Sequence, residues 1–339
     1  MAKKTKKKKR SRKGLKRWKQ LKFGGKVWRV AWVGFLCVWG FTILQVLFCA
    51  VFYPPLTPLM IHRFFEQVKD ENREVNFERD YVRLDEISAN LVNAVVVSED
   101  GLYMYHHGFD IKQMKMAYIE GKKGRRERGG STISQQCAKN CFLPHHHSML
   151  RKAAEAYYTI MIEAVWGKKR IMECYLNIIE FGDGIYGCEA ASQHYFGHSA
   201  SHLTKREAAL LAVCLPTPLK SNPGRPSGYL SRQASVVQGR MAMYGRINLD
   251  AKREDLNPMY VAMMEEENIW DFAVWMLTDG ESLHPKHAKG SKAATTAKPR
   301  RKSEPKAAAP VDEPEEVMDE PFYEEPEIVP AENDAPEEP

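Results

Sequence analysis

The sequence predicts a mainly α-helical domain that follows a single N-terminal transmembrane helix. Residues 30–53 form a run of 24 residues without a charged side chain, long enough to cross the hydrocarbon core of a bilayer as one helix. Residues 84–245 repeat apolar side chains at helical spacing, and no segment among them has the clear alternation of a strand. The apolar span and the helical periodicity together predict this fold class.

The charged residues are concentrated in two tails. The net charge is +7 over 339 residues, but residues 1–29 carry 15 Lys and Arg without an acid, and residues 311–339 carry 13 Asp and Glu without a base. Residues 30–283 are therefore nearly neutral, so the basic balance does not indicate nucleic-acid binding. Residues 284–339 are rich in Ala, Lys and Pro and then in Glu and Pro, which predicts a disordered basic and then acidic tail.

A retained anchor explains the apolar run better than a cleaved signal peptide or a buried soluble helix. A signal peptide has an apolar core of about 7–15 residues and a small-residue cleavage site, and no such site precedes Pro54 and Pro55. Lys and Arg beside a span stay on the cytoplasmic side of the membrane. We therefore expect residues 1–29 to be a basic cytoplasmic tail, residues 30–53 to cross the membrane, and the rest of the chain to lie outside the cytoplasm.

Apolar spacing and capping signals predict the order of the helices. Residues 54–83 are expected to form a stalk and membrane-proximal segment, and the glycine-rich basic stretch 121–130 a mobile loop. Capping boxes begin at Thr132 and at Thr204. Residues 246–283 are expected to form a C-terminal helical extension, for which the sequence indicates no function. The predicted helices cover residues 85–100, 111–119, 132–142, 150–166, 171–182, 204–215 and 230–244.

Several residues that often carry chemistry point to ordinary structure here. The sequence has seven cysteines and no CxxC pair, and Cys137 and Cys141 fit one packing face of a helix better than a bridge or a metal site. The three histidines at 145–147 fit a solvated turn better than a metal site, because adjacent rings rarely aim at one ion. The SxxK motif from Ser303 to Lys306 has no SDN or KTG partner, which excludes penicillin-type transpeptidase chemistry.

Two predicted helices carry polar side chains suited to a reaction. Glu99 and Asp100 end one helix and precede His106, although an acidic pair at a helix end is more often a hydrogen-bonded terminus than a catalytic pair. Glu155 taken alone fits an ordinary charge on an amphipathic helix. The helix after residues 129–130 has a polar face beside the basic loop and could meet an anionic phosphate group. This face is formed by Gln135, Gln136, Lys139 and Asn140.

Taken in order, five blocks of the sequence resemble the motif series of the peptidoglycan glycosyltransferases. The block GGSTISQQCAKN is highly specific, and the resemblance covers roughly residues 84–245. The basic anchor and the missing transpeptidase domain point to the monofunctional type. The resemblance implies a lysozyme-like glycosyltransferase domain, mainly helical, with a flexible jaw that faces the membrane. The five blocks are SEDGLYMYHHGFD, RGGSTISQQCAKN, RKAAEAYYTIMIE, KKRIMECYLNIIEFGDGIYGCEAASQHYFG and REAALLAVCLPTPLKSNP.

The resemblance implies an enzyme of the bacterial inner membrane, with its catalytic domain in the periplasm. Such an enzyme joins the disaccharide units of lipid II into glycan strands and releases undecaprenyl pyrophosphate, with inversion at the anomeric carbon. Lipid II, the growing glycan strand and the membrane are the implied partners, together with proteins of cell-wall synthesis or division. No cofactor is implied with certainty, although a divalent cation, Mg²⁺ or Mn²⁺, near Glu155 fits the resemblance.

The resemblance also implies roles for individual residues. Glu99 matches the general base, and Asp100 and His106 shape its surroundings. Glu155 matches a second carboxylate that helps to bind a metal or orients the donor substrate. The remaining matched residues would line the cleft for the pyrophosphate and the sugars, and they are Ser131, Thr132, Gln135, Gln136, Lys139, Asn140 and Arg151.

Two positions depart from the pattern of the family. His147 stands where an arginine is usual, so donor binding is expected to be weaker or dependent on pH. Tyr103 replaces a usual phenylalanine and adds a hydroxyl. Two alternatives stay open at this point: a lytic muramidase, because lysozyme-like folds also use a glutamate to cleave glycans, and a non-catalytic membrane scaffold for cell-wall synthesis whose acidic tail, residues 311–339, recruits partners.

Overall fold

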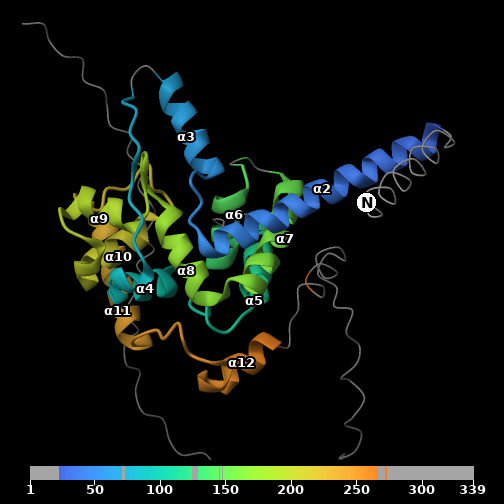
Figure 1. The fold of residues 1–339 in the computed structure, drawn as a ribbon. Helices are drawn as coiled ribbons and strands as arrows, with labels where there is room; N and C mark the ends of the chain where they lie inside the picture. Colours follow the sequence, from blue (N-terminus) through green and yellow to red (C-terminus); the bar gives the residue numbers. More distant parts are fainter. Residues whose placement is uncertain are drawn as a thin grey trace, which may run out of the picture. The chain divides into compact units, whose positions relative to one another are not determined.

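The computed structural model describes residues 23–70, 73–123, 129–144, 146, 148–265 and 272. The predicted tail 284–339, residues 1–22, the centre of the predicted basic loop and His147 lie outside these residues. The predicted fold class is confirmed, because helices dominate the described chain (Figure 1). The helices are α2 Phe23–Val51, α3 Pro58–Lys69, α4 Ala89–Glu99, α5 Ile111–Lys122, α6 Ile133–Phe142, α7 Met149–Val165, α8 Gly167–Ile178, α9 Cys188–Phe196, α10 Lys205–Cys214, α11 Gly228–Tyr244 and α12 Pro258–Glu265.

One hydrophobic core joins two groups of helices. Helix α4 packs against α10 and α11, while α6 packs against α7 and α8 (Figure 1). The apolar stripes that predicted these helices supply the core, since Leu91 and Val95 on α4, Ile133 on α6 and Ile171 on α8 are fully buried. Cys137 and Cys141 belong to the same core, which confirms the packing interpretation, and their Sγ atoms lie within 4.8 Å of that of Cys174.

The predicted capping boxes set the beginnings of α6 and α10. Thr132 accepts a hydrogen bond from the backbone N–H of Gln135, and the Gln135 side chain accepts one from the backbone N–H of Thr132. Thr204 and Glu207 form the same reciprocal pair at α10. Each box satisfies backbone donors that a helix leaves unpaired in its first turn, so both helices begin where the sequence predicts.

A small sheet, absent from the prediction, interrupts the helices. The helix predicted to reach residue 182 ends at Ile178, and the chain continues as β2 Glu180–Gly182 and β3 Ile185–Tyr186. These strands pair antiparallel, and β1 Glu78–Arg79 adds parallel to β3, which gives the order β1-β3-β2. The expectation of no strand between residues 84 and 245 was wrong, because strands of two or three residues are too short to show alternation.

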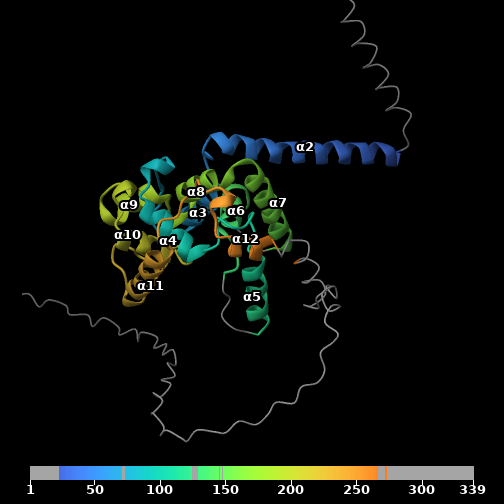
Figure 2. The ribbon, with the colours of Figure 1, turned by 90° about the horizontal axis from the view of Figure 1, so that it is seen from below.

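The predicted anchor is a single unbroken helix, α2, which begins at Phe23 and ends at Val51 (Figures 1 and 2). Among the described residues it is the one helix long and apolar enough to cross a membrane. Most of its side chains are exposed, but its C-terminal part packs against α7. Tyr158 donates a hydrogen bond to Oε1 of Gln45 at 3.0 Å, and Trp166 Nε1 donates to the carbonyl of Val46 at 2.8 Å.

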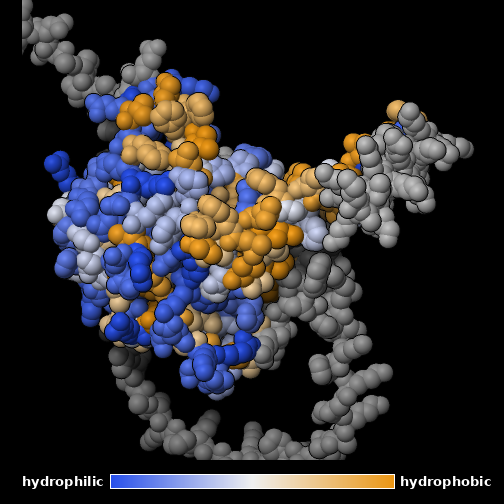
Figure 3. Space-filling view, viewed as in Figure 1, coloured by the Kyte–Doolittle hydropathy of each residue, from blue (hydrophilic) through white to orange (hydrophobic). Residues whose placement is uncertain are grey.

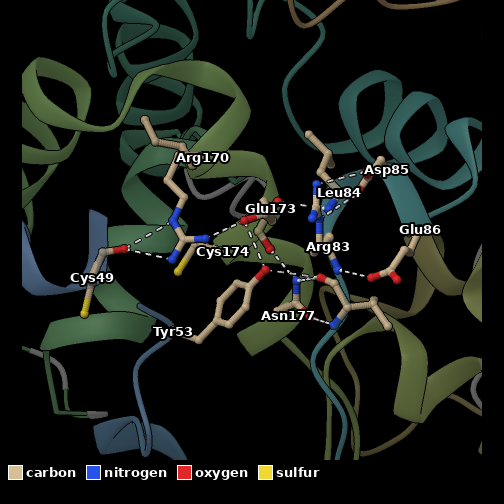
Figure 4. A network of polar contacts seen from close by, with 12 residues as sticks. Cys49, Tyr53, Arg83, Leu84, Asp85, Glu86, Arg170, Glu173, Cys174 and Asn177 are labelled. Carbon is tan, nitrogen blue, oxygen red and sulfur yellow. Dashed lines mark hydrogen bonds and ion pairs between the residues drawn. The ribbon is translucent and has the colours of Figure 1, made fainter. Parts of the chain in front are cut away.

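A polar network fixes the end of α2 to α8 (Figure 4). The guanidinium of Arg170 donates two hydrogen bonds to the carbonyl of Cys49, at 3.0 and 3.2 Å, and pairs with Glu173. The Glu173 carboxylate also accepts from the hydroxyl of Tyr53 at 3.1 Å and from the backbone N–H of Leu84 at 2.9 Å. One half-buried turn of α8 therefore holds both the end of α2 and the entry to the domain.

The segment 54–83, expected to be a stalk and membrane-proximal segment, contains α3 and β1. Thr57 caps α3, and Arg63 ties the helix to β2 through hydrogen bonds of 3.0 and 3.2 Å to the Glu180 carboxylate. The opposite side of α3 exposes apolar side chains, visible in orange at the top of Figure 3. These side chains are Ile61, Phe64, Phe65 and Val68.

Candidate active site

Glu99 is the last residue of α4, and its side chain is largely withdrawn from water. Its Oε2 accepts a hydrogen bond of 2.8 Å from Nε2 of Gln136 on α6, and the Oε1 of Gln136 accepts one of 3.0 Å from the hydroxyl of Tyr175. Burial raises the pKa of Glu99, the Gln136 hydrogen bond opposes this shift, and the neighbouring Asp100 adds to it. A carboxylate with a raised pKa and one fixed donor is suited to accept a proton.

Asp100 and His106 are brought together, but as a buried positioning pair. His106 Nδ1 accepts from the backbone N–H of Gly108 at 3.1 Å, which assigns the ring proton to Nε2. Nε2 then donates to the Asp100 carboxylate at 2.9 Å. Asp100 also accepts from the backbone N–H of Ile133 at 3.0 Å. The pair therefore links the segment after α4 to the first turn of α6 and holds Glu99 opposite Gln136.

Thr132 and Gln135, predicted as cleft residues, are mainly occupied by the cap of α6. Both are buried, and beyond the capping box the Thr132 hydroxyl donates to the carbonyl of Gly108 at 2.6 Å. Gln136 and Lys139 follow on the same helix, so the cap sets the direction in which these two side chains project. Asn140 is buried one turn after Gln136.

Glu155 lies on α7 with two basic side chains. Its carboxylate is buried, Oε2 accepts from Nη1 of Arg151 at 3.2 Å, and Oε1 pairs with Nζ of Lys152. Lys152 also donates to the hydroxyl of Ser131 at 3.2 Å, which connects the group to the start of α6. The basic side chains of Arg151 and Lys152 occupy both carboxylate oxygens of Glu155, so the arrangement does not fit the divalent cation considered for this residue.

Two basic groups near Glu155 have donors free for an anion. Lys139 makes no hydrogen bond or ion pair with any residue that the structure describes, although the carboxylates of Glu155 and Glu99 both act on its charge. Burial lowers the pKa of Lys139, and Glu155 opposes this shift. The Nε of Arg151 is buried without a hydrogen-bond partner among the described residues. A buried donor such as the Arg151 Nε is costly unless a ligand uses it, so the two groups are suited to bind an anion.

A cavity of about 420 Å³ opens onto Glu99. Its wall brings together four of the predicted site residues, Glu99, Asp100, Ser131 and Thr132. The other predicted residues lie outside this wall. Three of them contact a wall residue directly: His106 contacts Asp100, Gln135 contacts Thr132, and Gln136 contacts Glu99. Glu155 reaches Ser131 through Lys152.

The sequence prediction missed several residues that hold the site. Tyr175 was counted only as part of an apolar stripe, and Lys152 was not considered, although its i,i+3 spacing to Glu155 is a signal for an ion pair. Glu163 accepts from Ser134 at 2.5 Å and from Lys168 at 2.7 Å.

The hydroxyl that Tyr103 adds is used within the fold. It donates to the carbonyl of Lys168 at 2.8 Å, and the tyrosine side chain is fully buried. The substitution therefore costs no unpaired polar group.

Comparison with known proteins gives a consistent picture. A family model described as Transglycosylase matches residues 66–242. A biosynthetic peptidoglycan transglycosylase of Xanthomonas campestris pv. campestris (strain B100) is 41% identical over 204 residues, which cover 60% of this chain and 83% of the relative. Proteins of the same name from Caulobacter vibrioides (strain ATCC 19089 / CIP 103742 / CB 15) and Rhodospirillum centenum (strain ATCC 51521 / SW) are 45% identical over 184 residues and 44% identical over 198 residues. The alignments cover 54% and 58% of this chain, and 77% and 83% of those relatives.

Proposed function

Since this chain belongs to the transglycosylase family, we propose that it polymerises lipid II into glycan strands, releasing undecaprenyl pyrophosphate with inversion at the anomeric carbon. The chain is a peptidoglycan glycosyltransferase, and the proposal concerns its substrate, its product and its stereochemistry. The observation that carries it is that Glu99, which opens into a cavity, lies near enough to Lys139 for its carboxylate to act on the lysine charge, while the Lys139 ammonium and the Nε of Arg151 have no partner among the described residues.

Glu99 is proposed to act as the general base. Inversion in one displacement needs a carboxylate that takes the proton of the acceptor hydroxyl as this hydroxyl attacks the anomeric carbon. Burial raises the pKa of Glu99 toward the range in which a base is most effective near neutral pH, and Gln136 fixes the direction of its carboxylate.

Lys139 and Arg151 are proposed to stabilise the departing pyrophosphate. Negative charge grows on the leaving group in the transition state, and donors fixed in a partly buried site stabilise that charge strongly. The guanidinium of Arg151 offers its donors in a fixed fork, and an approaching anion favours the charged form of Lys139. Glu155 then orients Arg151 and Lys152, so we assign it a positioning role beside the donor substrate.

Helix α2 is proposed to anchor the enzyme in the bacterial inner membrane, with residues 1–29 in the cytoplasm and the domain of residues 84–245 in the periplasm. The length and composition of α2 support the span, and the basic residues before it support the orientation. The exposed apolar face of α3 supports contact with the same bilayer surface, from which a lipid-linked substrate would enter.

The test uses the purified full chain in detergent with labelled lipid II, resolved on a gel. We expect a ladder of polymer from the wild type and a severe loss with Lys139→Ala, whose thermal unfolding should stay cooperative. Lys205→Ala is a matched control, because Lys205 is exposed on α10, away from the site. The proposal fails if the wild type forms no polymer. An unchanged rate in Lys139→Ala would contradict the role proposed for Lys139. Degradation of preformed glycan without polymer would instead indicate a muramidase.

A further inference from the structure

The segment after α11 lies beyond the part of the chain that matches the family model, yet it is fixed to the domain. The side chain of Asn93 accepts from the backbone N–H of Ile247 at 3.0 Å and donates to the carbonyl of Gly245 at 3.3 Å. Lys169 and Asp250 form an ion pair of 2.7 Å. These contacts attach residues 246–250 to both α4 and α8.

The same segment then returns over the residues that follow Glu99. Nη1 of Arg253 lies 3.3 Å from Nε2 of His107, and the ring of Tyr260 on α12 meets that of Tyr105 edge-on, with 5.4 Å between their centroids. Residues 253–260 therefore contact the segment after α4 at Tyr105 and His107. Helix α12 consequently borders the candidate active site, although it lies outside the region that carries the family motifs.

Two cavities meet beneath α12. The cavity of about 420 Å³ that contains Glu99 is also lined by Arg240, Tyr244 and Tyr260. A second cavity, of about 590 Å³, lies between residues 246–260 and the segment after α4, and Tyr244 and Tyr260 line it as well. The two tyrosines therefore stand where a path from Glu99 continues into the second cavity.

The chemistry of this junction suits a saccharide. Tyr260 and Tyr244 keep 37% and 54% of their surface exposed, so their rings have free area for a ligand. A tyrosine ring offers an apolar face for the C–H face of a sugar and a hydroxyl for its polar edge. Arg240 makes no hydrogen bond or ion pair with the residues that the structure describes, so its donors are free for an amide or carboxylate substituent of an amino sugar.

We propose that α12 and the end of α11 form a saccharide-binding wall in which Tyr260, Tyr244 and Arg240 hold the glycan next to the unit that reacts at Glu99. This inference rests on the proposed function and adds a binding element supplied by the end of α11 and by α12. The wall holds sugar units outside the bond being formed, so it acts on substrate affinity and on strand length more than on the chemical step.

The test measures KM, kcat and product length with labelled lipid II and the full chain. Tyr260→Ala is expected to raise KM by about tenfold and to shorten the strands while kcat stays within about twofold, and Tyr260→Phe should restore most of the affinity. Tyr229→Ala is the matched control, because Tyr229 is 57% exposed near the start of α11 and lines neither cavity. Arg240→Gln should act in the same direction as Tyr260→Ala, unlike Arg232→Gln on the same helix.

The outcomes separate this inference from the proposed function. An active wild type with unchanged KM and strand length in Tyr260→Ala would overturn the wall and leave the proposed function intact, whereas an inactive wild type would overturn the proposed function itself. A Tyr260→Phe variant with a KM as high as that of Tyr260→Ala would also overturn the saccharide-binding wall, because the ring would then have no role. If Tyr260→Ala unfolds at a lower temperature than the wild type, the KM of Arg240→Gln is compared with that of Arg232→Gln. Equal KM values in these two variants would overturn the proposed saccharide-binding wall.

Discussion

Replacing Glu99 by glutamine separates proton transfer from binding. The substitution keeps the size of the side chain, and the new amide oxygen can still accept the hydrogen bond that Gln136 donates to Glu99 at 2.8 Å. The amide cannot take a proton from the acceptor hydroxyl. Burial, which raises the pKa of the carboxyl, makes the neutral amide at least as easy to accommodate, so Glu99→Gln should fold as stably as the wild type.

The expected loss of rate follows from the proposed role of Glu99 as a base. General base catalysis contributes typically about 10²–10⁴-fold, which corresponds to about 2.7–5.4 kcal/mol of transition-state stabilisation. The cationic donors of Lys139 and Arg151 remain in the variant, so binding of the pyrophosphate group should persist. We therefore expect an initial polymerisation rate at least about 10²-fold lower, with nearly unchanged affinity for the substrate.

The assay compares the initial rate of polymer formation with the affinity for a non-reacting lipid II analogue. Glu74→Gln is the matched control, because Glu74 is exposed and lines none of the cavities around the site. A Glu99→Gln enzyme with a near-normal rate would refute general base catalysis by this residue. A variant that also lost binding of the analogue would show that Glu99 supports the structure of the site.

Three further predictions address the proton, the fold and the topology. The rate of polymerisation should rise with pH as Glu99 ionises. Gln136→Ala should move this rise to higher pH, because the lost hydrogen bond favoured the charged carboxylate. A pH–rate profile of both enzymes checks the direction. Arg63→Ala should lower the free energy of unfolding by about 3 kcal/mol, the low end of the loss for a broken buried ion pair. The loss stays at the low end because Glu180 can take up a proton when Arg63 no longer neutralises it, since burial raises the pKa of Glu180 to about 7. Denaturant unfolding measures this loss, which should grow as the pH rises above 7. A reporter fused after Pro339 should be active only in the periplasm, and a soluble form that begins after residue 53 would contradict the retained anchor.

The helices of the domain could be predicted because their signals are local. The Thr132 and Thr204 capping boxes fix two helix starts to the residue, and Gly167, with a φ of +69°, separates α7 from α8 where the sequence indicated an end or a bend. The pairing of β1 with β3 joins residues more than 100 positions apart, and no local pattern predicts it. Strands β2 and β3 are instead joined by the two-residue turn Asp183–Gly184, a local hairpin signal that the sequence prediction did not use.

The resemblance predicts which residues form the candidate site, but the sequence does not predict which contacts each of their side chains makes. Asp100 lies beside Glu99 in the sequence, yet its partners are His106 and the backbone of Ile133, 33 residues away. Tyr175 reaches Gln136 across 39 residues. Such contacts depend on how helices pack, whereas the sequence shows only which residues share one helix face.

The polar residues within the apolar run 30–53 form hydrogen bonds with α7. Gln45 is the one strongly polar residue among residues 30–53, and polar side chains in a span are tolerated where they find partners. Gln45 pairs with Tyr158, and the hydroxyl of Thr42 lies 2.9 Å from that of Tyr157. Both tyrosines belong to α7, within three residues of Glu155. These contacts therefore join α2, the proposed anchor, to the helix that carries Glu155 and Arg151, so the proposed site keeps a set orientation toward the proposed bilayer.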